Sequence, residues 1–382
     1  MRVLVSTTAG AGHLGPLVPF ARALVGAGHD VVMAAPASFA ASVGKAGFTH
    51  EPFADASPEE LGAVFARIPG LSNYDANALV LREVFGRIDT RAALPGMRAL
   101  VDRWRPDLVL RDATEFASYV VADTEGIPHA SVAISLEAFE DEFLPAVEGP
   151  LADFGARSGV AGLQAATRLS LLPPAFEGAA ALARATTRRF RDDAPPTASG
   201  DALPDWWPGC SDPLVYVTFG SVAAEIGLFP MLYQGVVAAV ADERVRVLLT
   251  LGPAGDPEAL GPLPANVHVE RWWPQADLMP HAAAMVGHGG FGTTLAGLAA
   301  GVPMVVVPLF ADQPYTAARV EAVNAGVALE GGPAAVGGLG AALHQVLDGD
   351  WYRAGAQRVA EQIARLSPAS EAVALLEGLA DR

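Results

Sequence analysis

Residues 267–313 read VHVERWWPQADLMPHAAAMVGHGGFGTTLAGLAAGVPMVVVPLFADQ. Three features follow one another in this stretch: an aromatic pair, a glycine-rich turn, and a polar pair after an apolar run. They are Trp272–Trp273, His288–Thr294 and Asp312–Gln313. An aromatic face can hold a flat base, a glycine-rich turn can hold an anion, and a carboxylate beside an amide can hold sugar hydroxyls. The stretch therefore predicts a site for a nucleotide joined to a sugar.

The glycine-rich turn connects a buried strand at 285–286 to a helix at 293–300. Glycines let the backbone approach an anion closely, and the free N–H groups at a helix N-terminus favour negative charge. Taken alone, this pattern is only a tight turn, because it lacks the spacing of a dinucleotide fingerprint and the lysine of a P-loop. The candidate anion contacts in and around it are His288, Gly290, Gly292, Thr293 and Thr294.

The chain on either side alternates short apolar strands with helical patterns. Strands are predicted at 3–6, 30–35, 108–110 and 129–134, with helices at 16–25 and 115–125. After a Pro-, Gly- and Asp-rich segment, further strands are predicted at 214–219, 245–251, 267–270 and 302–307, and a further helix at 229–241. Short connections of this kind imply parallel sheets. We expect two α/β, doubly wound domains at 1–195 and 214–365, joined by a linker at 196–213.

Composition narrows the class of protein. A chain of 382 residues exceeds one ordinary hydrophobic core, and its single cysteine, Cys210, leaves no disulfide framework. The net charge of −17 argues against a nucleic-acid partner, which needs a basic surface. The apolar stretch at 297–311 is broken by glycine and proline, so we expect no membrane span. The short opening strand is not a secretory signal, and we expect a cytoplasmic protein.

His13 and Asp112 form a candidate acid–base pair. His13 lies in the predicted loop Thr7–Gly15 after the first strand, and Asp112 follows the strand at 107–110. The carboxyl ends of parallel strands meet at one edge, where this fold binds ligands. An imidazole can accept a proton near neutral pH, and a carboxylate can stabilise the imidazolium. The alternative for Asp112 is the N-cap of the helix that begins near Glu115. We interpret six further histidines as structural, with no spacing typical of a metal site: His29, His50, His129, His268, His281 and His344.

These motifs resemble those of family 1 glycosyltransferases, in particular the bacterial enzymes that decorate antibiotics. The string Trp272-Trp273-Pro274-Gln275 matches the family's Trp-x-Pro-Gln element, and Gly12-His13 matches its N-terminal Gly-His. The resemblance implies a GT-B fold, in which two Rossmann-like domains face a cleft. The N-terminal domain would bind the acceptor and the C-terminal domain the donor. A last helix at 366–382 would return to the first domain.

The resemblance also implies a role for each motif residue. Trp272 would stack on the base, the backbone of Trp273 would bind its edge, and Gln275 would lie near the ribose. Ser221 would contact the diphosphate, while Asp312 and Gln313 would hold the sugar. His13 would be the general base, paired with Asp112. Plant members carry a ribose-binding Glu eight residues after the motif histidine; here the position is Ala296. This absence favours a dTDP-sugar donor over a UDP-sugar.

The resulting expectation is an inverting, metal-independent glycosyltransferase without a bound cofactor. It would move a hexose or deoxyhexose from a dTDP-sugar to a lipophilic, polyketide-like aglycone in natural-product biosynthesis. A homodimer is compatible with the sequence. Three alternatives stay open: a UDP-glucose-dependent detoxifying transferase, a catalytically silent GT-B auxiliary protein, and a nucleotide-sugar epimerase. The sequence gives neither the acceptor nor the atom that receives the sugar.

Overall fold

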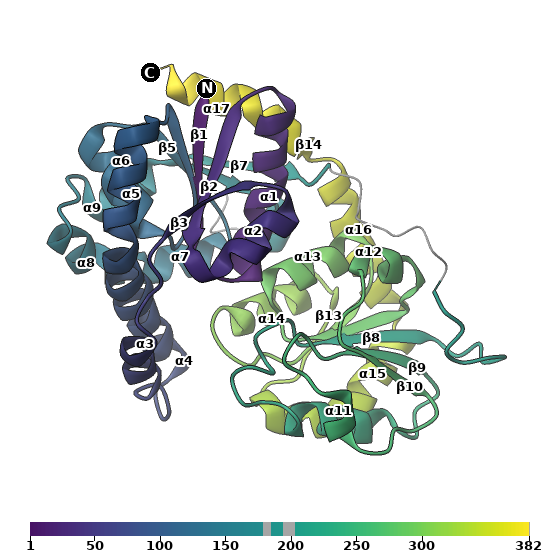
Figure 1. The fold of residues 1–382 in the computed structure, drawn as a ribbon. Coiled ribbons are helices and arrows are strands. Elements are labelled where there is room, and N and C mark those ends of the chain that lie inside the picture. The colour runs from purple at the N-terminus through teal and green to yellow at the C-terminus, as the bar shows by residue number, and fades with distance from the viewer. Residues whose placement is uncertain (179–184, 194–202, 382) are drawn as a thin grey trace. The chain divides into compact units, whose positions relative to one another are not determined.

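The computed structural model describes residues 1–178, 185–193 and 203–381. The chain forms two compact units (Figure 1). The first consists of Met1–Asp193 and Leu366–Arg382, and the second of Ala194–Arg365. Of the predicted linker 196–213, residues 196–202 lie outside the described part. Both units are built on parallel sheets flanked by helices, which confirms the predicted fold class.

The first unit has a parallel sheet of eight strands in its described part. Their order is β14 (Ser367–Pro368), β7 (Thr187–Arg191), β6 (Thr167–Ser170), β5 (His129–Val132), β4 (Leu108–Asp112), β1 (Arg2–Ser6), β2 (Asp30–Pro36) and β3 (Thr49–Phe53). Val5 of β1 pairs with Met33 on one side and Leu110 on the other. From β1 the chain adds β2 and β3 in one direction, and from β4 it adds strands in the other. This reversal between β1 and β4 makes a crevice at the carboxyl ends of these strands, the usual ligand position in such sheets.

Helices cover this sheet and extend beyond it. Residues 54–100 are largely helical, and the polypeptide from Asn73 to Trp104 runs through three consecutive helices, the middle one a π-helix. The helices are α1 (Ala11–Gly26), α2 (Ala40–Ala46), α3 (Pro58–Phe65), α4 (Asn73–Leu79), the π-helix η2 (Val80–Asp89), α5 (Thr90–Trp104), α6 (Phe116–Glu125), α7 (Glu137–Phe143), α8 (Glu148–Asp153), α9 (Gly159–Ala165) and α10 (Pro174–Glu177).

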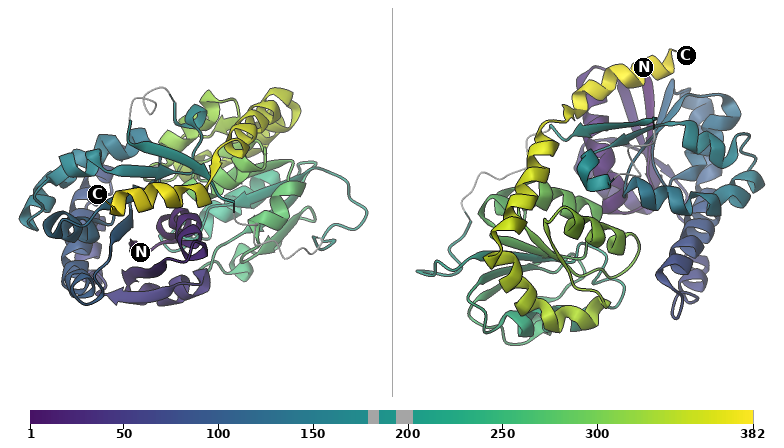
Figure 2. Two further views of the ribbon diagram at one scale, coloured as in Figure 1. Left: turned by 90° about the horizontal axis from the view of Figure 1, so that it is seen from above. Right: turned by 180° about the vertical axis from the view of Figure 1, so that it is seen from behind.

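The end of the chain belongs to the first unit. β14 extends the first sheet by pairing with β7, and α17 (Ala372–Ala380) packs against α1. His29 Nε2 lies 3.1 Å from Glu377 Oε1. The two termini consequently lie near each other in every view (Figures 1 and 2).

The second unit has a parallel sheet of six strands in its described part. Their order is β10 (Val267–Glu270), β9 (Arg246–Thr250), β8 (Leu214–Thr218), β11 (Ala284–Gly287), β12 (Met304–Val306) and β13 (Gly326–Ala328). The longer helices around it are α11 (Met231–Val240), α13 (Phe291–Ala299), α14 (Gln313–Ala322), α15 (Leu339–Asp348) and α16 (Asp350–Ala364), with the single turn α12 (Gln275–Leu278). Here the strand order reverses between β8 and β11, so the loops after these two strands flank the second crevice.

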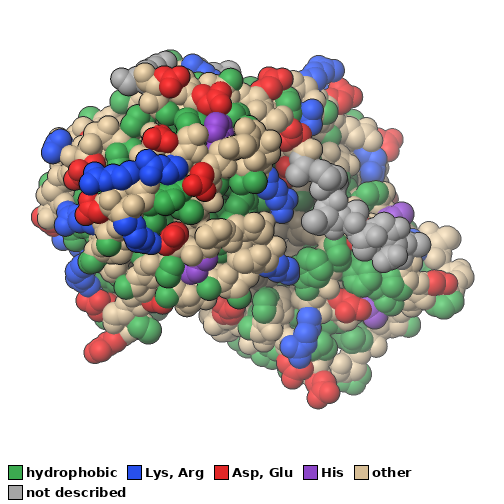
Figure 3. Space-filling view, turned by 45° about the horizontal axis from the view of Figure 1, so that its top comes forward, with side chains coloured by type: hydrophobic (Ala, Val, Ile, Leu, Met, Phe, Trp, Pro, Cys, Tyr) green, Lys and Arg blue, Asp and Glu red, His purple; other side chains and the backbone are tan. Residues whose placement is uncertain are grey.

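Each sheet lies in its own hydrophobic core. Val215, Val217 and Val286 are fully buried in the second unit, as are Leu4 and Val109 in the first. Acidic and basic side chains are interspersed over the face drawn in Figure 3, although acidic residues predominate in the sequence. No helix within the described ranges is both long and apolar enough to cross a membrane.

Candidate functional site

His13 and Asp112 meet at the crevice of the first unit. His13 Nδ1 lies 3.5 Å from Asp112 Oδ1 and 3.2 Å from Thr114 Oγ1. The His13 side chain is 21% exposed and that of Asp112 is 0% exposed, so a substrate can reach the imidazole and not the carboxylate. The predicted loop position of His13 is wrong. Helix α1 already begins at Ala11, directly after Gly10 with φ 139°, and His13 lies in its first turn.

Hydrogen bonds hold the Asp112 carboxylate in place. Oδ2 accepts from Thr8 N at 2.8 Å, and Oδ1 accepts from Thr114 N at 2.7 Å, Thr114 Oγ1 at 2.8 Å and Glu115 N at 3.0 Å. Burial by itself raises the pKa of Asp112. The charge of His13 and hydrogen bonds from His13, Thr8 and Thr114 outweigh burial and hold this pKa well below its usual range. The group is therefore ionised beside the imidazole.

Glu115 is the N-cap of α6, so the alternative role expected for Asp112 is wrong. Glu115 Oε1 accepts hydrogen bonds from Ala117 N at 2.9 Å and Ser118 N at 3.2 Å, and Oε2 accepts from Ser6 Oγ at 2.9 Å. These bonds satisfy the free N–H groups of the first helical turn. Asp112 is thereby left to pair with His13. The sequence could have indicated Glu115 as the N-cap, because it stands directly before Phe116, where the apolar helical pattern begins.

Arg111 supports the same segment from inside the unit. It is 2% exposed, and its Nη1 donates to the backbone oxygens of Asp112 at 3.0 Å and Ala113 at 3.1 Å. The guanidinium also lies 5.4 Å from the centre of the Tyr119 ring. Arg111 therefore fixes the backbone that carries the carboxylate, a role that no sequence pattern indicated.

The glycine-rich turn of the second unit encloses His288 between two glycines. A Cβ on Gly220 would lie 2.9 Å from His288 Cε1, and a Cβ on Gly290 would overlap His288 Nε2. Gly220 has φ 72° and is followed by Ser221, so the loop after β8 contacts the turn after β11. Burial, opposed by a hydrogen bond with the Thr218 backbone, lowers the pKa of His288 to about 4. The ring is therefore neutral at pH 7.

The first turn of α13 has open space beside Gly292. The helix begins at Phe291 after the N-cap Gly290, and no atom lies within 4 Å of where a Cβ on Gly292 would be. Gln275 Nε2 lies 3.5 Å from Thr293 Oγ1, which joins the aromatic element to this helix end. Thr294 is buried. The arrangement presents backbone N–H groups in a position suited to an anion.

The two tryptophans of the aromatic pair differ in exposure. Trp272 is 65% exposed, whereas Trp273 is partly buried and packs edge-on against Trp206, with ring centres 4.9 Å apart. Trp206 in turn stacks on His268 at 4.5 Å. Trp206 falls within the predicted linker, so this part of the linker supports the aromatic pair. The sequence did not indicate that contact.

Asp312 and Gln313 begin α14. Gln313 is 3% exposed, and its Oε1 accepts hydrogen bonds from Leu309 N at 2.8 Å and Phe310 N at 3.0 Å. Ala311 takes a left-handed φ of 55°, which is uncommon for a residue with a Cβ. A Cβ on Gly289 would lie 3.2 Å from the Gln313 backbone oxygen. The glycine-rich turn is thus in contact with the loops that carry Ser221 and Gln313.

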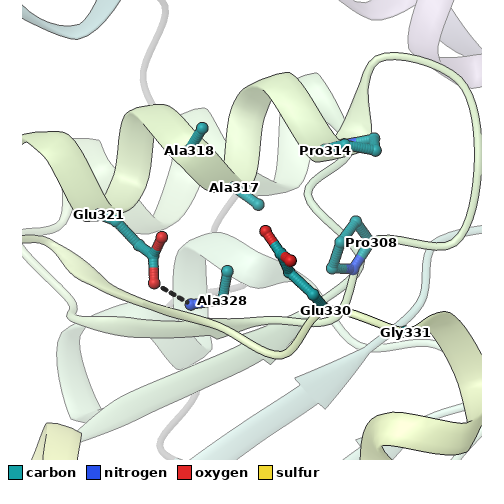
Figure 4. Close-up of a pocket in the computed structure, with 8 residues that line it drawn as sticks. All are labelled: Pro308, Pro314, Ala317, Ala318, Glu321, Ala328, Glu330 and Gly331. Atoms are coloured by element: carbon teal, nitrogen blue, oxygen red, sulfur yellow. Dashed lines mark hydrogen bonds between the residues drawn. The ribbon is translucent and has the colours of Figure 1, made fainter. Parts of the chain in front are cut away.

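A separate cavity of about 330 Å³ lies between α14 and β13 (Figure 4). Pro308 and Pro314, on either side of the Asp312 loop, form part of its wall, and the Glu330 carboxylate points into it. Glu321 Oε1 accepts a hydrogen bond from Ala328 N at 3.0 Å. None of the predicted donor-binding residues lines this cavity. No group of three or more His, Cys, Asp or Glu suited to a metal ion occurs among the described residues.

Comparison with known proteins places this geometry in a family. The family model described as erythromycin biosynthesis protein CIII-like matches with its N-terminal domain over residues 22–212 and its C-terminal domain over residues 234–379. The chain is 32% identical to 4'-demethylrebeccamycin synthase of Lentzea aerocolonigenes, covering 99% of both proteins. The chain belongs to the erythromycin biosynthesis protein CIII-like glycosyltransferases.

Further relatives support the same assignment. The chain is 32% identical to L-demethylnoviosyl transferase of Streptomyces niveus, covering 100% of this chain and 98% of the relative. The crystal structure of the glycosyltransferase SsfS6 from Streptomyces sp. SF2575, complexed with thymidine diphosphate, matches with a TM-score of 0.76 and 27% identity over 99% of both chains. The protein is therefore a glycosyltransferase of the bacterial natural-product type, with a GT-B fold.

Proposed function

We propose that this enzyme transfers a hexose or deoxyhexose from a dTDP-sugar to a hydroxyl group of a lipophilic aglycone, with inversion at the anomeric carbon. The observation that carries the proposal is the His13–Asp112 contact at the crevice of the first sheet, with the imidazole accessible and the carboxylate buried and ionised. A general base held by a carboxylate is what an acceptor hydroxyl needs in order to attack.

In the proposed reaction, His13 takes the proton of the acceptor hydroxyl as its oxygen attacks the anomeric carbon. The bond from that carbon to the diphosphate oxygen breaks, and the nucleoside diphosphate leaves with the electron pair. Asp112 stabilises the imidazolium that forms. A single displacement of this kind inverts the anomeric configuration.

The proposed donor site is the crevice of the second sheet. The N–H groups at the start of α13, with Ser221, His288 and Thr293, would bind the diphosphate. Hydrogen-bond donors fixed there stabilise the charge that grows on the leaving group. This set supplies stabilisation without a metal ion. Trp272 offers an exposed face to the base, and Asp312, on the loop fixed by Gln313, would bind the sugar.

The thymidine preference rests on two observations. Ala296 on α13 offers no carboxylate for a pair of ribose hydroxyls, and a structural relative binds thymidine diphosphate. The test is calorimetric titration of the protein with dTDP, UDP and GDP. We expect dTDP to bind most tightly. Tighter binding of UDP would favour the UDP-glucose alternative, and failure of all three to bind would contradict a donor site.

The stereochemical part needs a separate measurement. With a dTDP-sugar of defined anomeric configuration, NMR of the glycoside should show the opposite configuration. A product with retained configuration would contradict direct displacement and, with it, the role of His13.

A further inference from the structure

A π-helix forms a second wall beside His13. The ring of Phe85, in the middle of η2, lies with its centre 5.5 Å from the centre of the His13 ring. Asp89 follows four residues later, one turn along the same helix, and closes the π-helical segment. π-Helical turns are rare and are found frequently at functional sites. Residues four apart lie on one side of a helix, so Asp89, a carboxylate that the proposed mechanism does not use, lies on the side of η2 that carries Phe85.

The Asp89 carboxylate has no hydrogen-bond partner within the described part of the chain. It is half-buried, and its arginine neighbours on the helix form ion pairs elsewhere: Arg87 with Asp153 at 2.7 Å and Arg91 with Glu60 at 2.6 Å. A half-buried carboxylate without a protein partner is open to a hydrogen bond from water or from a ligand that binds beside His13.

The charges around Asp89 come from the catalytic elements. The pKa of Asp89 is raised to about 6, mainly by burial. The charge of His13 on α1 opposes this rise, and the charges of Asp112 and Glu115, on the segment from β4 to α6, add to it. Asp89 therefore lies within electrostatic reach of the His13–Asp112 pair. His13 directs Nδ1 at Asp112, so its Nε2 edge is turned away from that carboxylate.

We propose that Asp89 is an acceptor-binding residue that receives a hydrogen bond from a second hydroxyl or N–H group of the aglycone, adjacent to the hydroxyl that His13 deprotonates. The inference rests on the proposed function, in which the acceptor binds at His13. It narrows the acceptor class to molecules with two neighbouring hydrogen-bond donors, such as a catechol or a vicinal diol. Phe85 would provide an apolar contact to the same molecule.

The test uses two probes that differ by one hydroxyl, 2,3-dihydroxynaphthalene and 2-naphthol. Each is titrated calorimetrically into the full-length protein saturated with dTDP. We expect wild-type protein to bind 2,3-dihydroxynaphthalene at least about tenfold more tightly than 2-naphthol, because the second hydroxyl adds a hydrogen bond to a charged group. Asp89→Ala should weaken binding of the diol alone. Asp89→Asn should keep part of the preference, because its amide oxygen still accepts a hydrogen bond.

Two controls make the outcomes distinct. Asp102→Ala removes an exposed carboxylate from α5 of the same unit and should leave the preference unchanged. The transfer rate of His13→Ala is measured separately, since a full rate there would refute the proposed function without affecting the probe affinities. The Asp89 proposal is overturned if wild-type protein binds both probes equally, fails to bind the diol, or loses both probes to the same extent in Asp89→Ala.

Discussion

Replacing Asp112 with asparagine removes one charge at nearly constant shape. The carboxylate accepts hydrogen bonds at both oxygens, from Thr8 N at Oδ2 and from Thr114 and Glu115 at Oδ1. An asparagine has a single acceptor oxygen, so its amide N–H₂ must face at least one buried donor. Leaving a buried donor unsatisfied costs about 1–3 kcal/mol. We expect Asp112→Asn to fold with a free energy of unfolding lower by about that amount.

The effect on catalysis should be larger than the effect on folding. The carboxylate and the imidazolium are 3.5 Å apart. At an effective dielectric constant of 20, two unit charges at this separation attract by about 5 kcal/mol. Solvent near His13 reduces this value, so we expect kcat to fall by about 10²- to 10³-fold rather than by the full amount. The assay is the initial rate of glycoside formation with donor and acceptor both saturating.

The matched control is Asp123→Asn. Asp123, in α6, also accepts backbone hydrogen bonds, from Arg157 N and from Ser158 N at 2.9 Å, but makes no contact with His13. Its kcat should stay within about twofold of wild type, since surface substitutions of this kind have small effects. A folded Asp112→Asn protein that retained more than a tenth of the wild-type kcat would refute the proposed pairing.

The same substitution predicts a pH dependence of stability. The pKa of Asp112 in the folded protein is below its usual range, so the ionised carboxylate stabilises the folded state. That stabilisation is fully present above the unfolded pKa, about 3.9, and is lost as the pH falls through the folded pKa. The difference in unfolding free energy between wild type and Asp112→Asn, from urea titrations, should shrink as the pH falls below about 4. A difference that grew at acid pH would contradict the assignment.

Three other changes test the donor site. Gly220→Ala should lower the free energy of unfolding by about 2 kcal/mol or more and weaken dTDP binding. The reason is that residue 220 has a left-handed φ and its new Cβ would lie 2.9 Å from His288. Gly337→Ala, at a position with open space around it, should have neither effect. Trp272→Ala should raise the Kd for dTDP by about 5- to 150-fold through lost stacking. Trp351 is another exposed tryptophan, and Trp351→Ala should not change this Kd. The transfer rate should be the same in EDTA as in Mg²⁺; a rate lost in EDTA and restored by Mg²⁺ would contradict the metal-independent mechanism.

The central strands of both sheets were predictable, because buried parallel strands leave a strong signal, whereas β3, β6, β7, β13 and β14 were not predicted. Apolar runs bounded by glycine or proline gave β8 and β12 to within two residues, and the alternating Val-His-Val-Glu pattern gave β10 at Val267–Glu270 with its observed bounds. The strand order explains why motifs far apart in sequence meet. The loops after β8 and β11 are distant along the chain and adjoin at the reversal of the second sheet.

What the sequence did not indicate depends on contacts between segments. Gly10 starts α1 where glycines and Pro16 favoured a loop, because a φ of 139° at the cap is visible only in the backbone. The π-helix at Val80–Asp89 has the same residue types as an ordinary helix. Trp206 supports Trp273 from a segment whose composition is that of a linker. Each of these features is set by tertiary packing, which local propensity cannot determine.

The central claim is that His13 removes the acceptor proton. The measurement that tests it most directly is kcat of His13→Ala with dTDP-sugar and acceptor saturating, in a protein shown by calorimetry to bind dTDP with wild-type affinity. We predict a loss of at least about 10²-fold, the usual contribution of a general base. A His13→Ala enzyme that transferred sugar at the wild-type rate would contradict the account.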